Sequence, residues 1–541
     1  MAKNYPNISG ESINSLTPQT EQASPDQVKN NAGGFAFKVT PWQHLDRFLI
    51  LGSSGGTFYV SERKLSKDAA STVAELLKED GIKVVDRIVE ISKAGRAAKN
   101  DPALFALAMA ASCEDAATRQ YALKMLPEVA RIGTHLFTFS SYANDLRGWG
   151  SGLQKAVGRW YNDMDASRLS FQVCKYASRR VEGENPWSHR DLLRKAHRPA
   201  ATEDHNLIYR YVTKGKEAFS DTEWNALRDH ESLRYLWGHE AAKVASNEKE
   251  LVELIKTYNL AHESIPTGLK KSKAVYDALV VNMPYTATLR NLGVMTNVGT
   301  LKSLTKTAEQ IAERLGDEDA IKKGRVHPLS ILTAMKVYSQ GHGFRGGLDW
   351  TPVDTIVDAL DDAFYKSFQF VEPTGKNYLI GVDVSGSMGS AISATPVLSC
   401  CEGAAAMAMT IARTEKNYKI MGFAHDFVNL GITAKDSLTT ACRKARMSNF
   451  GATDCALPMA YAKKQGLDVD AFMVITDNET WYGGHGWGGH RSTNNGHPFE
   501  ALKAYRKSSS KPESKLVVVG MTANDISIAD PTDAGMLDVV G

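Results

Sequence analysis

The chain has 541 residues, of which 43% are hydrophobic and 23% are charged, a composition typical of a globular protein with two to four domains. The formal net charge of +3 excludes a global excess of positive charge, so binding of nucleic acid would need a local cluster of basic side chains. No apolar run reaches the ~18 residues of a membrane span, and we expect none.

The N-terminal segment, residues 1–31, is rich in Asn, Ser, Gln, Thr and Pro and has no apolar stretch of the kind found in secretory signals. We predict a mobile tail there. The cysteines have neither metal-ligand nor disulfide-framework spacing, which favours reduced thiols and a cytoplasmic location. They are Cys113, Cys174, Cys400, Cys401, Cys442 and Cys455.

A long region after this tail has the apolar spacing of helices. Val84, Val85, Ile88 and Val89 recur at helical intervals, and Asp101 followed by proline is typical of a helix start. Short helices joined by short polar connections are the unit of an α-solenoid. No strict sequence period is present, so the pattern leaves a solenoid and a compact bundle equally open.

The segment 175–216 is locally basic, with ten Lys and Arg residues against five Asp and Glu residues. The pair Ser188 and Asp191 forms a capping-box pattern, which predicts a helix that starts near the next residue. Apolar residues form one face of that helix, and Arg190, Arg194 and His197 fall on another. Such a face can bind phosphate, but its ordinary meaning is a solvated surface.

Oxygen-bearing side chains follow a buried strand in the C-terminal third. The apolar run from Tyr378 to Asp383 predicts the strand, and Asp383, Ser385 and Ser387 then alternate along the loop. Three oxygen ligands at the carboxyl end of a sheet strand suit Mg²⁺. The alternative is a Ser/Gly-rich turn.

Two further segments supply matching ligands. Thr453 stands where a helix is expected to start, and Asp477 ends a second buried strand. With Asp383, Ser385 and Ser387, they resemble the metal-ion-dependent adhesion site of von Willebrand factor A domains. In that family these five positions hold the metal directly or through water.

The surroundings of these residues alternate between strand-like and helix-like runs, which predicts a doubly wound α/β domain, Rossmann-like in arrangement. The expected strands are 418–424 and 516–520, and the expected helices are 397–413 and 499–507.

Longer stretches resemble the Ro autoantigen family, whose members join a TROVE domain to a von Willebrand A domain. They include Trp187-Ser-His-Arg-Asp-Leu-Leu-Arg194, His342-Gly-Phe-Arg-Gly346 and Asp383-Val-Ser-Gly-Ser-Met388. The resemblance implies an all-α ring of HEAT-like repeats over residues 32–370, followed by the A domain over 371–541. It also implies that structured Y RNA binds outside the ring and that single-stranded RNA ends enter its central hole.

The family motif implies RNA contacts at Lys175 and His197. Its third basic contact falls where this chain carries extra residues, so Arg179 and Arg180 both remain candidates. The loop 481–497 is longer and richer in Gly, His and Trp than the family pattern. His485, His490 and His497 could bind a transition metal there, although a surface loop is the better interpretation.

Three functions compete. We expect an RNA-binding scaffold that holds a Y-like noncoding RNA and presents single-stranded 3′ ends to a 3′ exoribonuclease in RNA quality control. The alternative is a metal-dependent protein-adhesion module without an RNA role. A metal-dependent hydrolase is disfavoured because no base or second metal site stands in a recognisable motif beside Asp383, so we expect no catalytic residue and no enzyme activity.

Overall fold

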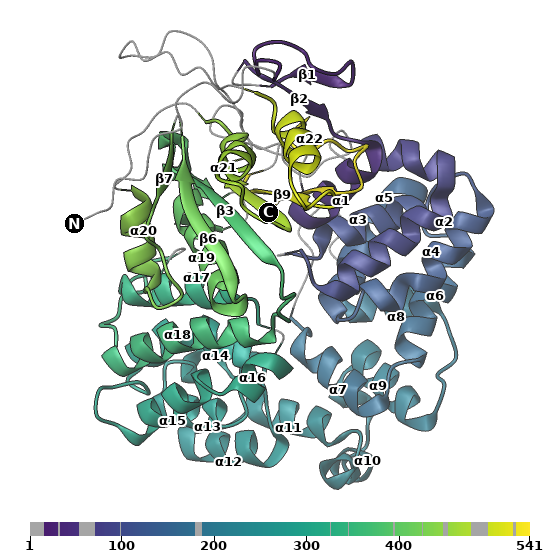
Figure 1. The fold of residues 1–541 in the computed structure, drawn as a ribbon. Helices are drawn as coiled ribbons and strands as arrows, with labels where there is room; N and C mark the ends of the chain where they lie inside the picture. The colour runs from purple at the N-terminus through teal and green to yellow at the C-terminus, as the bar shows by residue number, and fades with distance from the viewer. Residues whose placement is uncertain are drawn as a thin grey trace. The chain divides into compact units, whose positions relative to one another are not determined.

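The computed structural model divides the chain into two compact units, which are described separately (Figure 1). Unit 1 comprises Met1–Ala69, His327–Thr333 and Phe364–Gly541, and unit 2 comprises Ala70–Val326 and Ala334–Ala363. The residues that the structure describes are 16–30, 33–52, 71–97, 99–178, 187–324, 326–343, 346–392, 395–424, 426–446, 453–477, 496–522 and 526–540.

Unit 1 is built on a six-stranded mixed sheet with the order β11-β9-β8-β3-β6-β7. All neighbouring pairs are parallel except β6 with β7. Non-consecutive neighbours require crossovers, as expected for a doubly wound fold, so the predicted α/β class is confirmed. The strands are β3 (Asn377–Asp383), β6 (Asn417–Phe423), β7 (Phe427–Asn429), β8 (Ala471–Thr476), β9 (Lys515–Gly520) and β11 (Met536–Val540).

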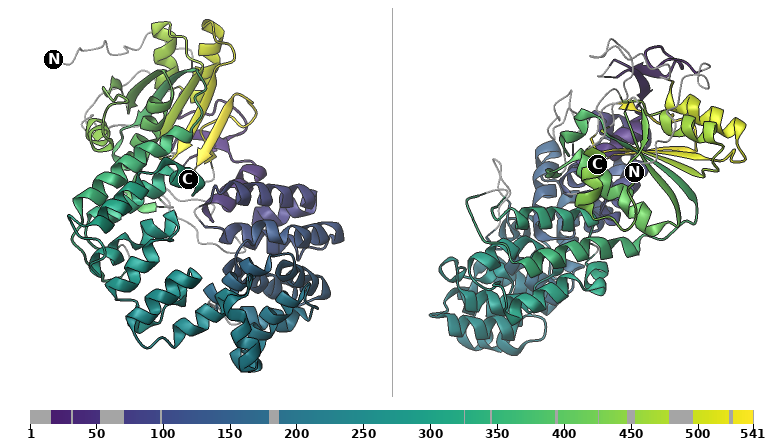
Figure 2. Two further views of the ribbon diagram at one scale, coloured as in Figure 1. Left: turned by 90° about the horizontal axis from the view of Figure 1, so that it is seen from below. Right: turned by 60° about the vertical axis from the view of Figure 1, so that its left-hand side comes forward.

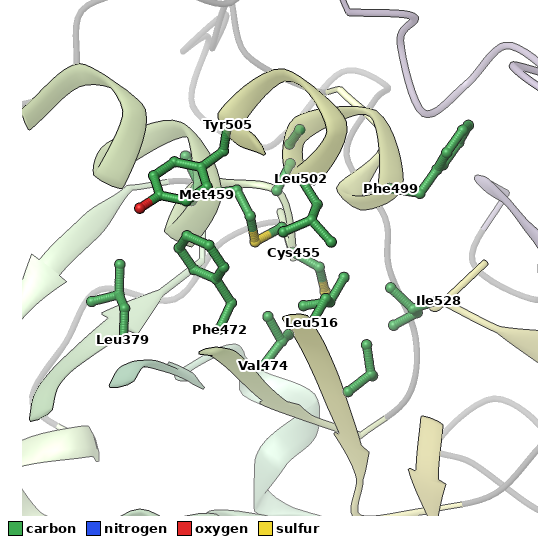
Figure 3. Close-up of a cluster of buried hydrophobic side chains, with 14 of the residues drawn as sticks. Leu379, Cys455, Met459, Phe472, Val474, Phe499, Leu502, Tyr505, Leu516 and Ile528 are labelled. Carbon is green, nitrogen blue, oxygen red and sulfur yellow. The ribbon is translucent and has the colours of Figure 1, made fainter. Parts of the chain in front are cut away.

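Helices cover both faces of this sheet, as the views in Figure 2 show. Helices α21 (Leu457–Gln465) and α22 (Pro498–Ser508) pack over one face, where Phe472, Leu516 and Tyr505 belong to an apolar core cluster (Figure 3). Helix α19 (Cys400–Thr414) contacts β3, β6 and β8, and α20 (Leu438–Arg446) packs against α19. Because side chains alternate along a strand, β3 is buried on both faces, which explains its uninterrupted apolar run.

The register of the sheet brings two strand ends together. In β3, Val382 lies opposite Ile475 of β8, and Asp383 lies opposite Phe423 of β6. The residues that follow these strands therefore meet at one edge, where open α/β sheets place their ligands.

Two expected boundaries within unit 1 were wrong. Residues 397–399, expected to be helical, belong to strand β5 (Thr395–Ser399), which pairs with β4 (Ala391–Ile392), and α19 starts after a capping box on Ser399. Thr453 does not open a helix, because α21 begins only at Leu457.

The N-terminal segment is part of unit 1 wherever the structure describes it. Strand β1 (Gln27–Lys29) pairs with β2 (Phe35–Lys38), which also pairs with β10 (Ile526–Ser527) near the C-terminus. Helix α1 (Pro41–Leu51) carries Arg47, whose guanidinium forms a buried ion pair with Asp538 of β11. Residues 16–30 are therefore not the mobile tail that composition suggested, and residues 33–52 belong to the α/β unit.

Unit 2 is entirely helical in the residues described, as the sequence predicted, and α17 and α18 cross its boundary with unit 1. Its helices are α2 (Ser71–Ala94), α3 (Asp101–Ala110), α4 (Ala116–Val129), α5 (Gly133–Arg147), α6 (Ser151–Asn162), α7 (Ala166–Lys175), α8 (His189–Ala196), α9 (Glu203–Lys214), α10 (Asp221–Ala226), α11 (Arg234–Lys243), α12 (Glu248–Tyr258), α13 (Lys273–Val280), α14 (Tyr285–Asn297), α15 (Lys306–Leu315), α16 (Glu318–Lys323), α17 (Pro328–Ser339) and α18 (Asp354–Lys366).

Helix packing in unit 2 follows the order of the chain. Helices α2, α4, α6 and α8 pack each on the next, α3 packs on α5, and α11, α12 and α13 form a further row. Figure 2 shows these helices succeeding one another in sequence order. Contacts between near neighbours are the mark of a solenoid, so this packing favours the solenoid over the compact bundle.

Candidate metal centre and nucleic-acid interface

Asp383 lies at the carboxyl end of β3 and is fully buried. Its Oδ1 accepts a hydrogen bond from the Ser385 backbone N–H at 2.8 Å, and its Oδ2 accepts one from the Thr476 hydroxyl at 2.7 Å. The Ser385 and Ser387 hydroxyl oxygens lie 3.0 Å apart in the following turn. The loop thus gathers one carboxylate and two hydroxyls, as predicted, and Thr476 is a partner that the sequence did not reveal.

Thr453 is brought to the same edge by the end of β6. The backbone N–H of the next residue, Asp454, donates to the carbonyl of Ala424 at 3.0 Å, and Ala424 directly follows β6. Because β6 is the neighbour of β3, this bond fixes the Thr453 segment beside the loop after Asp383. Thr453 is 8% exposed, so its hydroxyl lies within the edge and not on the outer surface.

Asp477 follows β8, and its backbone carbonyl accepts a hydrogen bond from Thr522. Its side chain is buried, as is that of Asp383. Burial, and after it the negative charge of Asp477, raise the pKa of Asp383 well above its ordinary value. Two buried carboxylates that repel each other, with hydroxyl oxygens beside them, fit a hard divalent cation such as Mg²⁺.

A contact from the N-terminal segment supports this edge and was missed at the sequence level. Gln19 is fully buried, and its amide nitrogen contacts Asp454 Oδ1 at 3.4 Å and the Gly496 carbonyl at 3.1 Å. Asp454 also accepts from the backbone N–H of Ala456 at 2.9 Å. Polar composition around Gln19 suggested a tail, and nothing in the pattern marked one glutamine as a buried anchor.

Of the three histidines in the long loop, His497 lies among the described residues. His485 and His490 lie outside the described residues. His497 is buried, with its ring nitrogens 3.1 Å from the Gln27 amide nitrogen and 2.9 Å from the Glu21 carbonyl. Both contacts tie the loop to the N-terminal segment, so His497 has a structural role and is not an exposed loop ligand.

Helix α8 in unit 2 begins as predicted. Ser188 and Asp191 form the capping box, with Ser188 Oγ accepting from the Asp191 N–H at 3.3 Å and Asp191 Oδ2 accepting from the Ser188 N–H at 3.1 Å. Leu192 is buried against the neighbouring helices, whereas Arg190 and Arg194 are exposed. The buried apolar side of the helix therefore holds it in place, while its arginines are exposed to solvent.

Lys175 is the last residue of α7, and its ammonium lies over two aromatic rings. Its Nζ is 5.4 Å from the Phe171 ring centre and 5.6 Å from that of Tyr176. A Cβ at Gly133 would meet both Tyr176 at 3.1 Å and His189 at 2.6 Å. The end of α7 and the start of α8 therefore converge on one glycine, which places Lys175 beside the basic helix.

His197 occupies a different position from the one predicted. Helix α8 ends at Ala196, and His197 caps it in the left-handed conformation at φ 45° and ψ 44°. It is exposed and lies just beyond the helix, which the prediction had extended to include it. A non-glycine residue in this conformation costs about 1 kcal/mol, so its neighbours must hold it there.

Asn162, at the end of α6, holds the chain just after His197. Its Nδ2 donates to the Pro199 carbonyl at 3.0 Å, and its Oδ1 accepts from the Ala201 N–H at 3.1 Å. The Tyr209 hydroxyl donates to the same oxygen at 2.5 Å. Sequence reasoning did not find Asn162, because its partners lie more than thirty residues away along the chain.

Other members of the basic segment are engaged elsewhere. Arg210 forms an ion pair with Glu223 at 2.9 Å and lies over the Phe219 ring, so it stabilises a local turn. Arg179 and Arg180 lie outside the described residues, and the structure does not choose between them. The described basic residues at this location include Lys175, Arg190, Arg194, Lys195, His197 and Arg198.

Comparisons with known proteins agree with both units. A TROVE domain model matches residues 28–340, and a Ro60 vWA domain model matches residues 377–541. The chain belongs to the Ro60 family. Within the part of the chain that the structure describes, no helix is long and apolar enough to cross a membrane.

Ro60 relatives align over nearly the whole chain. The "RNA-binding protein RO60" of Deinococcus radiodurans is 40% identical over 533 residues, which cover 98% of this chain and 96% of that protein. The protein of the same name from Caenorhabditis elegans is 34% identical, over 97% of this chain and 89% of its own length. The crystal structure of the D. radiodurans RO (RSR) protein matches with a TM-score of 0.73 at 38% identity, covering 93% of this chain and 97% of that one.

Proposed function

We propose that this Ro60 family member is an RNA-binding scaffold. It would bind a structured Y-like noncoding RNA on the outside of a helical ring and single-stranded 3′ ends in the central hole. The observation that carries the proposal is the basic surface made by Lys175, Arg190, Arg194 and His197, mounted on packed helices. Both relatives described above are named RNA-binding proteins, which supports the proposal.

The chemistry of this surface suits a polyanion. Exposed arginines can fork onto phosphate oxygens, and an imidazole can donate to a phosphate or stack on a base. The ammonium group of Lys175 lies close to two aromatic rings, which restrict the position of this side chain. A surface with cations in fixed places can neutralise successive phosphates of one strand.

The metal edge of unit 1 would act as a docking site and not as a catalytic one. Asp383, Ser385, Ser387, Thr453 and Asp477 would hold Mg²⁺ directly or through water, and the bound ion would offer a coordination position to an oxygen of a partner protein. We propose that the scaffold acts in the cytoplasm as an adaptor to a 3′ exoribonuclease in RNA quality control, without hydrolysing RNA itself. The buried carboxylates also suit the alternative function, a protein-adhesion module without RNA.

The test is RNA binding by the double variant Lys175→Ala/His197→Ala, measured with a duplex that carries a single-stranded 3′ end. The affinity for this RNA should fall. The slope of log affinity against log salt concentration should become shallower by roughly 0.7 for each lost phosphate contact. Lys249→Ala is the matched control, because Lys249 is an exposed lysine on the acidic helix α12. Unchanged affinity and slope in the double variant would contradict the assignment.

A further inference from the structure

Two tryptophans from separate elements stack beside the basic helix. Trp149 lies between α5 and α6, and Trp187 directly precedes the capping residue of α8 (Figure 1). Their ring centres are 5.1 Å apart and their planes differ by 21°, which is an offset stack. Trp187 is 5% exposed, whereas Trp149 is partly exposed. The pair therefore has a buried member and an outer member.

Lys195 of α8 joins the pair to the basic surface. Its ammonium nitrogen is 5.7 Å from the Trp149 ring centre and 5.5 Å from that of Trp187. With the 5.1 Å between the rings, these distances form a nearly equilateral triangle, so the ammonium lies beside the stack and not on the outer face of Trp149. The indole N–H of Trp149 also donates to the Lys195 carbonyl at 3.3 Å.

The glycines on both sides of Trp149 border open space. A Cβ built at Gly148 or at Gly150 would meet no atom within 4 Å. Gly148 has a φ of 83°, which turns the chain where α5 ends and Trp149 begins. Trp187 covers one face of the Trp149 indole, and the exposed part of that indole therefore belongs to its other face and its edges.

A packing role alone does not account for this arrangement. A tryptophan needed only to fasten a loop would be buried, as Trp187 is. Here an indole remains partly exposed beside the ammonium group of Lys195, on the helix that also carries Arg190 and Arg194. An aromatic platform next to cations that follow a phosphate backbone is the usual design for binding an unpaired nucleobase.

We propose that the outer face of Trp149 stacks on an unpaired nucleobase of RNA bound along α8, with Lys195 beside the adjoining phosphate. This inference rests on the proposed function, and it names the chemical group that this part of the surface recognises. Stacking does not depend on base identity, so the site would accept any unpaired base.

The experiment compares Trp149→Ala and Trp149→Phe on short single-stranded oligoadenylate and on the same strand with its bases removed. Trp149→Ala should bind oligoadenylate roughly tenfold more weakly, with an unchanged salt slope because no phosphate contact is lost. Trp149→Phe should retain most of the affinity. On the abasic strand, all three proteins should bind equally. Trp237→Phe is the matched control, because Trp237 is also a partly exposed tryptophan with a cation, Arg228, over its ring.

Fluorescence gives a second readout if Trp149→Ala fails to fold. Oligoadenylate should quench the tryptophan emission of the original protein and of Trp237→Phe, and this quenching should be largely lost in Trp149→Phe. Equal quenching in Trp149→Phe, or equal weakening of Trp149→Ala on the abasic strand, would overturn the proposed stacking. A wild-type protein that binds neither strand nor any RNA with a 3′ end would overturn the proposed function as well.

Discussion

Carboxyl groups with strongly raised pKa values lie in unit 1 and imidazoles with pKa values lowered to about 4 lie in unit 2, although unit 1 also buries His497. Unit 1 encloses Asp383 and Asp454 at the sheet edge, and burial raises the pKa of Asp454 to about 8. Unit 2 holds the half-buried His135 and the buried His239, and desolvation lowers the pKa of each imidazole to about 4. Unit 1 thus holds acids that would gain from a cation, whereas unit 2 keeps these imidazoles neutral and places its cations on the surface. The difference suits a metal edge in one unit and a phosphate-binding surface in the other.

The largest effect that this comparison predicts is acid instability of unit 2. The folded pKa of His135 and of His239 is about 4 against an ordinary value of 6.5, so the unfolded chain binds more protons between these values. Stability is fully present above 6.5 and is lost as pH falls towards 4, by up to about 3 kcal/mol for each histidine.

The free energy of unfolding in urea would be measured between these two pH values, and hydrogen exchange would report the stability of each unit separately. His135→Gln should reduce the loss of unit 2 stability as the pH falls, whereas His342→Gln, at an exposed position, should leave that loss unchanged. In metal-free unit 1 the raised carboxyl pKa acts in the opposite sense, because stability falls as pH rises from about 4 towards 8. If the stability of both units changed with pH in the same direction, the predicted difference between the units would be wrong.

The next effect concerns the cation. Mg²⁺ should stabilise unit 1 by about 2.7 kcal/mol at a concentration one hundred times its dissociation constant, because it binds the folded edge and not the unfolded chain. Ser385→Ala/Ser387→Ala should abolish most of this gain and leave the metal-free melting temperature nearly unchanged. Calorimetric titration and melts with and without EDTA would measure both. Unfolding of unit 1 by EDTA alone would mean that the metal is structural and would remove the basis for docking.

A smaller effect is expected from Asn162, which we interpret as a positioning residue for His197. Asn162→Ala should weaken RNA binding by about 1 kcal/mol, the worth of the lost hydrogen bonds to the Pro199 carbonyl and the Ala201 N–H. The same substitution should have little further effect in a His197→Ala background, because there is no imidazole left to position. Full additivity of the two losses would show that Asn162 acts independently of His197.

How much the sequence predicts depends on whether the cause is local. The strand before Asp383, the capping box of α8 and the alternation of strands and helices in unit 1 were all predicted. Each depends on residues that are close together in the sequence. The left-handed cap at His197 was not predicted, and the Asn162 side chain that bonds the chain just after it lies more than thirty residues away in sequence. Gln19 was misjudged for the same reason, because its buried partners lie more than four hundred residues away.

The proposed metal ligands illustrate both the reach and the limit of prediction from sequence. Asp383, Ser385 and Ser387 are adjacent in sequence and could be grouped by spacing alone. Thr453 and Asp477 could be added only through the resemblance, and the hydroxyl of Thr476 escaped notice although it hydrogen-bonds Asp383. Its position in a buried strand made it look like an ordinary core residue.

The most direct test of the account is RNA affinity in two double variants at constant salt and without Mg²⁺. We assign RNA binding to the basic surface of unit 2 and metal-dependent docking to unit 1. Ser385→Ala/Ser387→Ala should therefore bind a 3′-ended RNA within about twofold of the original protein, and Lys175→Ala/His197→Ala should bind it at least roughly tenfold more weakly. The reverse order of these two losses would contradict the assignment.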